Sequence, residues 1–301
     1  MVAGFKELKA RLDKHGFRPR RGLGQNFLLD PNLLGFIADA LPLDRDSVVL
    51  EIGAGAGGLT RELARRAGRI IAVEIDARLV AFLEEELRRW GTDRERVELL
   101  HGDALGPDGL SADCQAGLAR ATAGGSGYVC VSNLPYAASG PLLAALSQSA
   151  LSPENGLCLC QWELAARILA EPASPGYGTL SVLLALAFAP RLLRRVPPEV
   201  FRPRPRVDSA LVSLGPARSF LERPASERSA FGRFLMGLFG GRRKVLCNAL
   251  KRVWKLEPGR IFDQEDLPAA WLGSRPEELG PESLLRIFEA ERVMQAGGDQ
   301  P

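Results

Sequence analysis

The chain has 301 residues, 46% of them hydrophobic, and its formal net charge is +3. A chain of this length and hydrophobic content can bury a full core, and it is long enough for one large domain and a smaller one. The net charge alone does not identify a nucleic-acid-binding protein. The N-terminus is charged from Lys6 onward, so we expect no signal peptide, and the longest apolar run, residues 180–189, is too short to span a bilayer. We therefore expect a soluble, cytoplasmic protein with no membrane association.

Metal and disulfide chemistry is not indicated. The five cysteines are scattered without a C-x-x-C pair, and the two histidines, His15 and His101, are too few for an ordinary zinc site. We expect reduced thiols and no metal. Cys158 and Cys160 are spaced to lie on one face of a strand.

Basic residues are concentrated in three segments, at residues 6–21, 191–206 and 242–255. Any one of these segments is equally consistent with a solvated surface. Three of them in a mildly basic chain favour a polyanionic partner.

Strands and helices alternate over residues 48–150. Buried strands are predicted at 48–52, 69–75, 97–100 and 128–132, and amphipathic or capped helices at 59–67 and 77–90. This alternation predicts a parallel, doubly wound α/β sheet with ligands at the carboxyl ends of its strands. Residues 106–127 are expected to form a loop or a weak helix.

The residue pattern changes near residue 215, where a proline-containing connection precedes a region whose pattern predicts helices. We expect two domains, an α/β domain at 1–215 and a small all-α domain at 216–301.

The first predicted strand ends in the glycine loop EIGAGAGGLT, residues 51–60. Its glycines satisfy both the dinucleotide fingerprint and the pattern of other adenosyl-cofactor loops, so the loop does not choose its cofactor. Glu74 ends the second strand, where an acid accepts hydrogen bonds from ribose hydroxyls. Asp103 follows the third strand and suits an adenine amino group. A surface acid is the alternative interpretation of Glu74, and a turn aspartate is that of Asp103.

The fourth strand runs into Asn133-Leu134-Pro135-Tyr136. An exocyclic amine of a nucleobase is a poor nucleophile, and its N–H groups need acceptors while the nitrogen becomes tetrahedral. The amide oxygen of Asn133 and the carbonyl of Leu134 would supply two acceptors. Pro135 would restrict the backbone and so fix the direction of that carbonyl, and Tyr136 would stack on a flipped base. An Asx-Pro turn with a packed Tyr is the alternative.

Further segments complete the pattern: Gly24-Gln25-Asn26-Phe27-Leu28, Tyr177-Gly178-Thr179-Leu180-Ser181-Val182, residues 201–209, residues 242–250 and residues 275–279. In order and spacing, these motifs resemble the ribosomal RNA adenine dimethyltransferase family over nearly the whole chain. The resemblance implies a Rossmann-like class I S-adenosylmethionine-dependent methyltransferase domain with a small C-terminal all-α domain that contacts RNA.

The resemblance also implies functional residues. Catalysis would fall to Asn133, Leu134, Pro135, Tyr136 and Phe201, the last stacking on the target adenine from the side opposite Tyr136. S-adenosylmethionine would be bound by Gln25, Asn26, Leu28, Glu51, Gly53, Gly55, Gly57, Glu74, Ile75, Asp103, Ala104 and Asn133. We interpret the fingerprint match at Gly58 as a coincidence of a glycine-rich turn.

The implied reaction is dimethylation of N6 on two adjacent adenosines near the 3′ end of small-subunit rRNA, in the immature small subunit, by a monomeric enzyme. The sulfonium methyl is already electrophilic, so alignment suffices and no general base is required. The chain departs from the family pattern at Ala137, where Asn is common, and at Gln161-Trp162-Glu163, where Lys is common at the middle position. Trp162 is either a packed side chain or a stacking surface.

Three alternatives stay open. A dehydrogenase is permitted by the glycine loop but does not explain residues 133–136. A non-catalytic RNA-binding assembly factor could keep the same fold. A large-subunit rRNA methyltransferase of the antibiotic-resistance type would share the catalytic motif.

Overall fold

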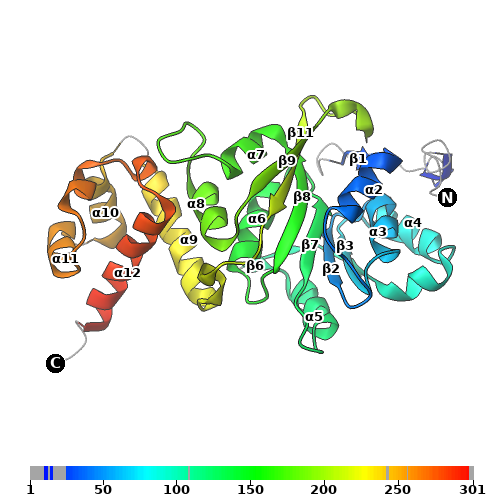
Figure 1. The fold of residues 1–301 in the computed structure, drawn as a ribbon, viewed down its shortest axis with the longest axis horizontal. Helices are drawn as coiled ribbons and strands as arrows, with labels where there is room; N and C mark the ends of the chain where they lie inside the picture. The colour runs from blue at the N-terminus through cyan, green and yellow to red at the C-terminus, as the bar shows by residue number, and fades with distance from the viewer. Residues whose placement is uncertain are drawn as a thin grey trace. The chain divides into compact units, whose positions relative to one another are not determined.

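The structure is a computed structural model that describes residues 10–12, 14–15, 25–107, 109–241, 244–255 and 257–297. The chain divides into two compact units (Figure 1). The first comprises Met1–Ala165 and Phe188–Ala217, and the second comprises Ala166–Ala187 and Arg218–Pro301.

The first unit is built on a seven-stranded sheet with strand order β4-β3-β2-β7-β8-β11-β9. Its strands are β2 (Val48–Ile52), β3 (Arg69–Glu74), β4 (Val97–His101), β7 (Val129–Asn133), β8 (Asn155–Gln161), β9 (Arg191–Val196) and β11 (Ser209–Leu214). The first five run parallel, whereas β11 pairs antiparallel with both β8 and β9. The strand order reverses at β2, so β2 and β7 form the switch point where α/β sheets bind ligands.

Helices lie around this sheet in the first unit (Figure 1). They are α2 (Pro31–Asp39), α3 (Gly58–Ala64), α4 (Ala77–Leu87), α5 (Ala112–Ala121), α6 (Ser139–Gln148) and the 3₁₀ turns η2 (Gly91–Arg96) and η3 (Pro198–Val200). Two short strand pairs complete the unit: β1 (Phe27–Leu28) with β10 (Phe201–Arg202), and β5 (Leu105–Gly106) with β6 (Gly109–Leu110). The expected doubly wound α/β arrangement is thus confirmed.

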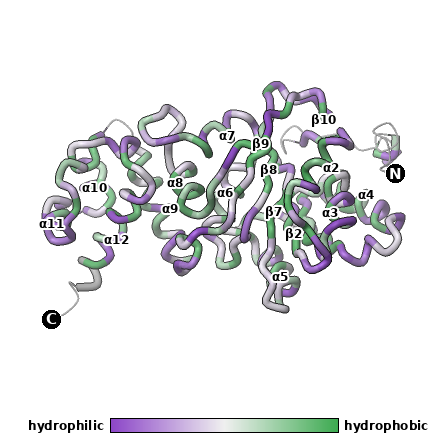
Figure 2. The backbone as a smooth tube through the Cα atoms, viewed as in Figure 1, coloured by the Kyte–Doolittle hydropathy of each residue, from purple (hydrophilic) through white to green (hydrophobic). Residues whose placement is uncertain are grey.

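The core of the first unit lies between the sheet and its helices. Every residue of β2 is buried, as is typical of a parallel strand covered on both faces. Val49, Val131 and Leu157 pack in one cluster with helix residues such as Leu34 and Leu63. The edge strand β9 is different, because five of its six residues are exposed and three are arginines. Figure 2 shows the hydropathy along the chain, with hydrophilic residues in β9 and mostly hydrophobic residues in β8.

Three elements, α5, β9 and β11, differ from the sequence-based expectation. Residues 112–121 form the full helix α5, with Ser111 capping its N-terminus through the amide of Cys114, although the segment has few large apolar residues. Strands β9 and β11 were not predicted. β9 is an Arg-rich edge strand, and its polar sequence carries no burial signal.

The second unit is helical. It contains α8 (Thr179–Ala187), η4 (Ser219–Glu222), α9 (Ala225–Phe239), α10 (Leu246–Trp254), α11 (Pro258–Gln264), η5 (Ala269–Gly273), η6 (Pro276–Glu278) and α12 (Pro281–Gly297), and α7 (Trp162–Ile168) runs into it from the first unit. Aromatic side chains form its core: the ring of Phe231 lies 5.3 Å from that of Phe288 and 5.7 Å from that of Phe220.

We expected a domain boundary after residue 215. The chain leaves the first unit for the last time after Ala217, two residues later. The segment Ala166–Ala187, which we expected in the first domain, clusters with the second unit instead. The reason is that α8 is apolar on almost all sides and contacts α9 and α12. The Tyr177 hydroxyl also donates a hydrogen bond to the Leu279 carbonyl at 2.9 Å.

Across the described ranges, no helix combines the length and apolar character needed to cross a membrane. Most of the basic segment 6–21, together with Gly24, Arg242 and Arg243, lies outside the described residues.

Candidate active site

A cavity of about 280 Å³ lies at the carboxyl ends of β2, β3, β4 and β7. It is bordered by residues from all four strand ends and from the segment around β1. The predicted residues that line it are Gln25, Asn26, Leu28, Glu51, Gly53, Gly55, Glu74, Ile75, Asp103, Ala104, Asn133, Leu134, Pro135 and Tyr136. Two predicted residues, Gly57 and Phe201, do not line it.

The glycine loop approaches the cavity through Gly55. This residue has a φ of +58°, and its amide donates a hydrogen bond to Oε2 of Glu74 at 2.8 Å. A Cβ here would lie 3.3 Å from the Phe27 ring, so a side chain would meet both backbone strain and a neighbour. The loop backbone is therefore bound directly to the acid that ends β3.

Gly57 lies outside the cavity lining and has a structural role. It is the N-cap of α3 with a φ of +79°, and a Cβ there would lie 2.4 Å from Cδ1 of the buried Leu83. The residue is thus needed for the left-handed turn and for packing against α4. Gly58, which we interpreted as coincidental, does line the cavity.

Glu74 is buried and held from two sides. Besides the bond from Gly55, its Oε1 accepts a hydrogen bond from the amide of Asp76 at 2.9 Å. Burial raises the pKa of its carboxyl, and these backbone bonds oppose the shift. Each oxygen retains a further lone pair, so the carboxylate can accept hydrogen bonds from a ribose diol in a fixed direction.

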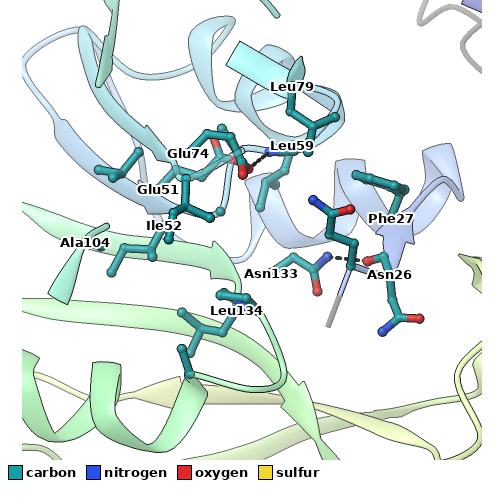
Figure 3. Close-up of a pocket in the computed structure, with 18 of the residues that line it drawn as sticks. Asn26, Phe27, Glu51, Ile52, Leu59, Glu74, Leu79, Ala104, Asn133 and Leu134 are labelled. Atoms are coloured by element: carbon teal, nitrogen blue, oxygen red, sulfur yellow. Dashed lines mark hydrogen bonds between the residues drawn. The ribbon is translucent and has the colours of Figure 1, made fainter. Parts of the chain in front are cut away.

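Glu51 is the most buried acid of the cavity. It is 1% exposed, and its Oε2 makes no hydrogen bond within the described part of the chain. Burial raises the pKa of Glu51 to about 8; Thr60 opposes this shift and the Glu74 carboxylate adds to it. Figure 3 shows the two acids side by side. An unpaired buried oxygen of this kind suits an ammonium group.

Asp103 follows β4, whose last residue His101 pairs with Glu74. The Oδ1 of Asp103 accepts a hydrogen bond from the amide of Leu105 at 2.9 Å, which fixes the carboxylate at the cavity edge. Ile75, 47% exposed, borders the cavity beside it. A planar ring placed between them would have an apolar surface and an acceptor for an amino group.

The segment around β1 closes another side of the cavity. β1 pairs with β10 through Phe27↔Arg202 and Leu28↔Phe201. The side-chain amide of Gln25 donates to Oδ2 of Asp76 at 3.0 Å. Asp76 in turn is paired with Arg78, which holds the pKa of its carboxyl well below the usual value.

Asn133 ends β7, and its side chain has a defined orientation. Its Nδ2 donates to the backbone carbonyl of Asn26 at 3.2 Å, the bond drawn in Figure 3. Its Oδ1 is buried and has no hydrogen-bond partner within the described residues. Because the nitrogen is bound to Asn26, the oxygen is left as an acceptor at the cavity wall.

Tyr136 is anchored beside Asn133. Its hydroxyl shares a 2.5 Å hydrogen bond with Oγ of Ser209, the first residue of β11. Burial raises the pKa of this hydroxyl, with the Ser209 bond opposing, so the phenol stays neutral. The carbonyl of Pro135 accepts from the Ser139 hydroxyl at 2.9 Å and starts the turn into α6.

Phe201 lies behind Tyr136, away from the cavity. It is fully buried in the core cluster, and its ring meets that of Tyr136 edge to face at 6.4 Å. Strand β10 pairs with β1 at this position and directs the ring inward. In this conformation the side chain supports Tyr136 and does not offer a face to a ligand.

Sequence reasoning missed two positioning serines. The hydroxyl of Ser132 accepts from the amide of Ile52 at 2.9 Å and so ties the end of β2 to β7. Ser209 fixes Tyr136, as described above. Serines carry no motif of their own, and a polar residue inside an apolar strand was the available signal. The apolar cavity residues Leu34, Leu59, Leu79 and Leu142 were not separable from core positions.

The residues of the cavity fit S-adenosylmethionine. Glu51 offers an unpaired acceptor for an ammonium group, Glu74 a fixed carboxylate for ribose hydroxyls, and Asp103 an acceptor for an adenine amine. Gly53 and Gly55 let the backbone approach. At the far end Asn133 presents its oxygen where a methyl acceptor would enter.

Known proteins identify the family of this chain. Residues 16–264 match the family model described as ribosomal RNA adenine dimethylase. The chain is 38% identical over 307 residues to a ribosomal RNA small subunit methyltransferase A of Pelotomaculum thermopropionicum, which covers 99% of each chain. It is 39% identical over 287 residues to the protein of the same name from Geobacter metallireducens, covering 94% of this chain and 98% of that one.

A solved structure supports the fold. The crystal structure of a dimethyladenosine transferase from Plasmodium falciparum matches with a TM-score of 0.66 at 23% identity, covering 87% of this chain and 97% of that chain. The first unit therefore has the Rossmann-like class I methyltransferase fold. Together with the family match over residues 16–264, these likenesses show that the chain belongs to the ribosomal RNA adenine dimethylase family.

Proposed function

We propose that this protein dimethylates N6 of two adjacent adenosines near the 3′ end of small-subunit rRNA while the small ribosomal subunit is assembled. The methyl donor is S-adenosylmethionine, and the reaction is that of an rRNA adenine dimethyltransferase, as the family and the named relatives indicate.

The observation that carries the proposal is the orientation of Asn133. The carbonyl of Asn26 binds its amide nitrogen, and its buried oxygen is left without a partner at the cavity wall. A nucleobase amine brought to this point would give one N–H to that oxygen and the other to the Leu134 carbonyl. These two bonds hold the nitrogen while its lone pair leaves conjugation with the ring.

The donor supplies an activated methyl group on a sulfonium. The chain's own residues then have three tasks. Asn133 and Leu134 orient the amine, Tyr136 offers a ring for the flipped base, and the β1 segment with Leu34 and Leu142 keeps water away. In the second transfer the amine carries only one N–H, so one acceptor suffices. The methyl group already present must fit beside the other acceptor.

The RNA partner is supported by exposed basic side chains. Arg191, Arg194 and Arg202 lie at or near the β9 edge, and Lys244, Lys251 and Lys255 lie in the second unit. We propose that both groups bind phosphates, with the helical domain contributing to RNA contact. Such binding depends on salt and little on sequence, so site choice would follow RNA shape.

We further propose that the enzyme acts in the cytoplasm as a monomer on the immature small subunit. The five cysteines are all free and four of them are buried, which agrees with a reducing compartment.

The test replaces Asn133 with Ala. We expect methyl transfer to small-subunit rRNA to fall about 100-fold or more, because an acceptor made in the transition state is lost. Affinity for RNA should change little, and thermal unfolding reports whether the variant is folded. The matched control is Asn155→Ala, since Asn155 also has a buried, unpartnered Oδ1 but lies at the start of β8. Near-normal activity in Asn133→Ala would refute the catalytic assignment of Asn133, whereas RNA binding without any methyl transfer by the wild-type protein would favour a non-catalytic assembly role.

A further inference from the structure

Trp162 and Arg195 form a stacked pair close to the end of β7, the strand that carries Asn133. The guanidinium carbon of Arg195 lies over the Trp162 ring, 4.6 Å from its centroid. Trp162 is half-buried, whereas the Arg195 side chain is 61% exposed. One face of the guanidinium therefore covers the indole, and the other is open to solvent.

Asp208 anchors this pair. Its Oδ2 accepts a hydrogen bond from Nε of Arg195 at 2.7 Å and forms an ion pair with Nη2 at 2.6 Å. Its backbone carbonyl accepts a hydrogen bond from the amide of Trp162 at 2.9 Å. Nη1 of Arg195 makes no hydrogen bond with the described residues, so its donors remain available. The carboxylate fixes the plane of the guanidinium, which lowers the entropy lost when a second planar group stacks on it.

The pair lies at the same end of the sheet as the catalytic motif. Asn133 pairs with Leu159 of the neighbouring strand β8, and Trp162 directly follows the end of that strand. Ser209, which binds the Tyr136 hydroxyl, pairs with Gln161 and follows Asp208 in the chain. Because the Ser209 hydroxyl binds Tyr136 and Asp208 binds both Trp162 and Arg195, two consecutive residues link the pair to Tyr136.

The neighbouring arginine provides a contrast. Arg194 points to the opposite face of β9, as the alternation of a strand requires, and lies over Phe36 of α2 at 5.6 Å. It has the same charge and a similar aromatic contact, but no carboxylate fixes its plane in the described structure. Of these two arginines, Arg195 alone combines a fixed plane, an open face and a position beside the catalytic end.

We propose that Trp162, Arg195 and Asp208 form a stacking subsite for an RNA base next to the target adenosine. The base lies on the open face of the Arg195 guanidinium, giving a Trp–Arg–base stack, and Nη1 donates to that nucleotide's phosphate or base edge. Guanidinium planes and aromatic rings are common platforms for unpaired RNA bases. This inference rests on the proposed function, because it takes small-subunit rRNA as the substrate.

The experiment compares two small-subunit rRNA fragments, one intact and one with an abasic nucleotide directly beside the target adenosine. We expect the wild-type protein to bind the abasic fragment about tenfold more weakly. Trp162→Ala should bind the intact fragment about tenfold more weakly than wild type and lose nothing further on the abasic one. Arg195→Lys, which keeps the charge but loses the plane, should behave like Trp162→Ala, and Trp162→Phe should restore most of the affinity.

Arg194→Ala is the matched control, and it should weaken binding of both fragments by the same factor. Thermal unfolding and S-adenosylhomocysteine binding report whether each variant is folded. Wild-type affinity for intact RNA in Trp162→Ala, or a further tenfold loss on the abasic fragment, would overturn the subsite while leaving rRNA methylation standing. If the wild-type protein neither binds nor methylates the intact fragment, the proposed function fails and the subsite with it.

Discussion

At the residue scale, the ionisation of Glu51 makes the stability of the folded protein depend on pH. Burial raises the pKa of its carboxyl to about 8 from an ordinary value of 4.5. The folded protein therefore holds a proton that the unfolded chain releases at lower pH. The stability this proton contributes is fully present below the unfolded pKa and is lost as pH rises through the folded pKa.

We predict that Glu51→Gln flattens the pH dependence of unfolding between about pH 5 and pH 9. The amide never ionises, so the variant should be more stable than wild type at the alkaline end. Urea unfolding at several pH values checks this. Bound S-adenosylhomocysteine carries an ammonium that favours the ionised Glu51, so its stabilising effect should grow with pH in wild type and stay nearly constant in the variant. Parallel pH profiles for the two proteins would contradict the assignment.

At the element scale, the turn from β2 into α3 depends on Gly57. Its φ of +79° and the 2.4 Å approach of a Cβ to Leu83 would both penalise a side chain. We predict that Gly57→Ala lowers the free energy of unfolding by about 2 kcal/mol, from backbone strain and overpacking. Thermal or urea unfolding measures the change.

The control for this prediction is Gly35→Ala in α2, where a Cβ would meet nothing within 4 Å and the residue lies within a helix. That variant should be neutral or slightly more stable. Since Gly57 does not line the cavity, Gly57→Ala should retain its affinity for S-adenosylhomocysteine. A stable variant that fails to bind this ligand would restore the original interpretation of Gly57 as a cofactor residue.

The elements show which signals a sequence carries. The parallel strands β2, β3, β4 and β7 were predicted nearly to the residue. In β2, β3 and β7, covering both faces demands continuous apolar runs. Edge strand β9 was missed, since an exposed arginine-rich segment carries no such signal. Helix α5 was left ambiguous because its small residues weaken the helical periodicity.

At the scale of the whole molecule, the motifs predicted which strand ends meet but not what each side chain contacts. Glu74, Asp103 and Asn133 reach one cavity because parallel strands end at one edge of the sheet. The burial of Phe201 and the inclusion of 166–187 in the second unit depend on contacts between segments far apart in sequence. Local patterns do not encode such contacts. The same holds for the Trp162–Arg195–Asp208 cluster, whose members come from α7, β9 and the residue that precedes β11.

The most direct test of the central claim is mass spectrometry of nuclease-digested rRNA. Unmethylated small subunits would be incubated with S-adenosylmethionine, with and without the protein, and large subunits treated in parallel. We predict a gain of N6,N6-dimethyladenosine at two adjacent positions near the 3′ end of small-subunit rRNA only when the protein is present. No gain of dimethyladenosine, or a gain confined to large-subunit rRNA, would contradict the account.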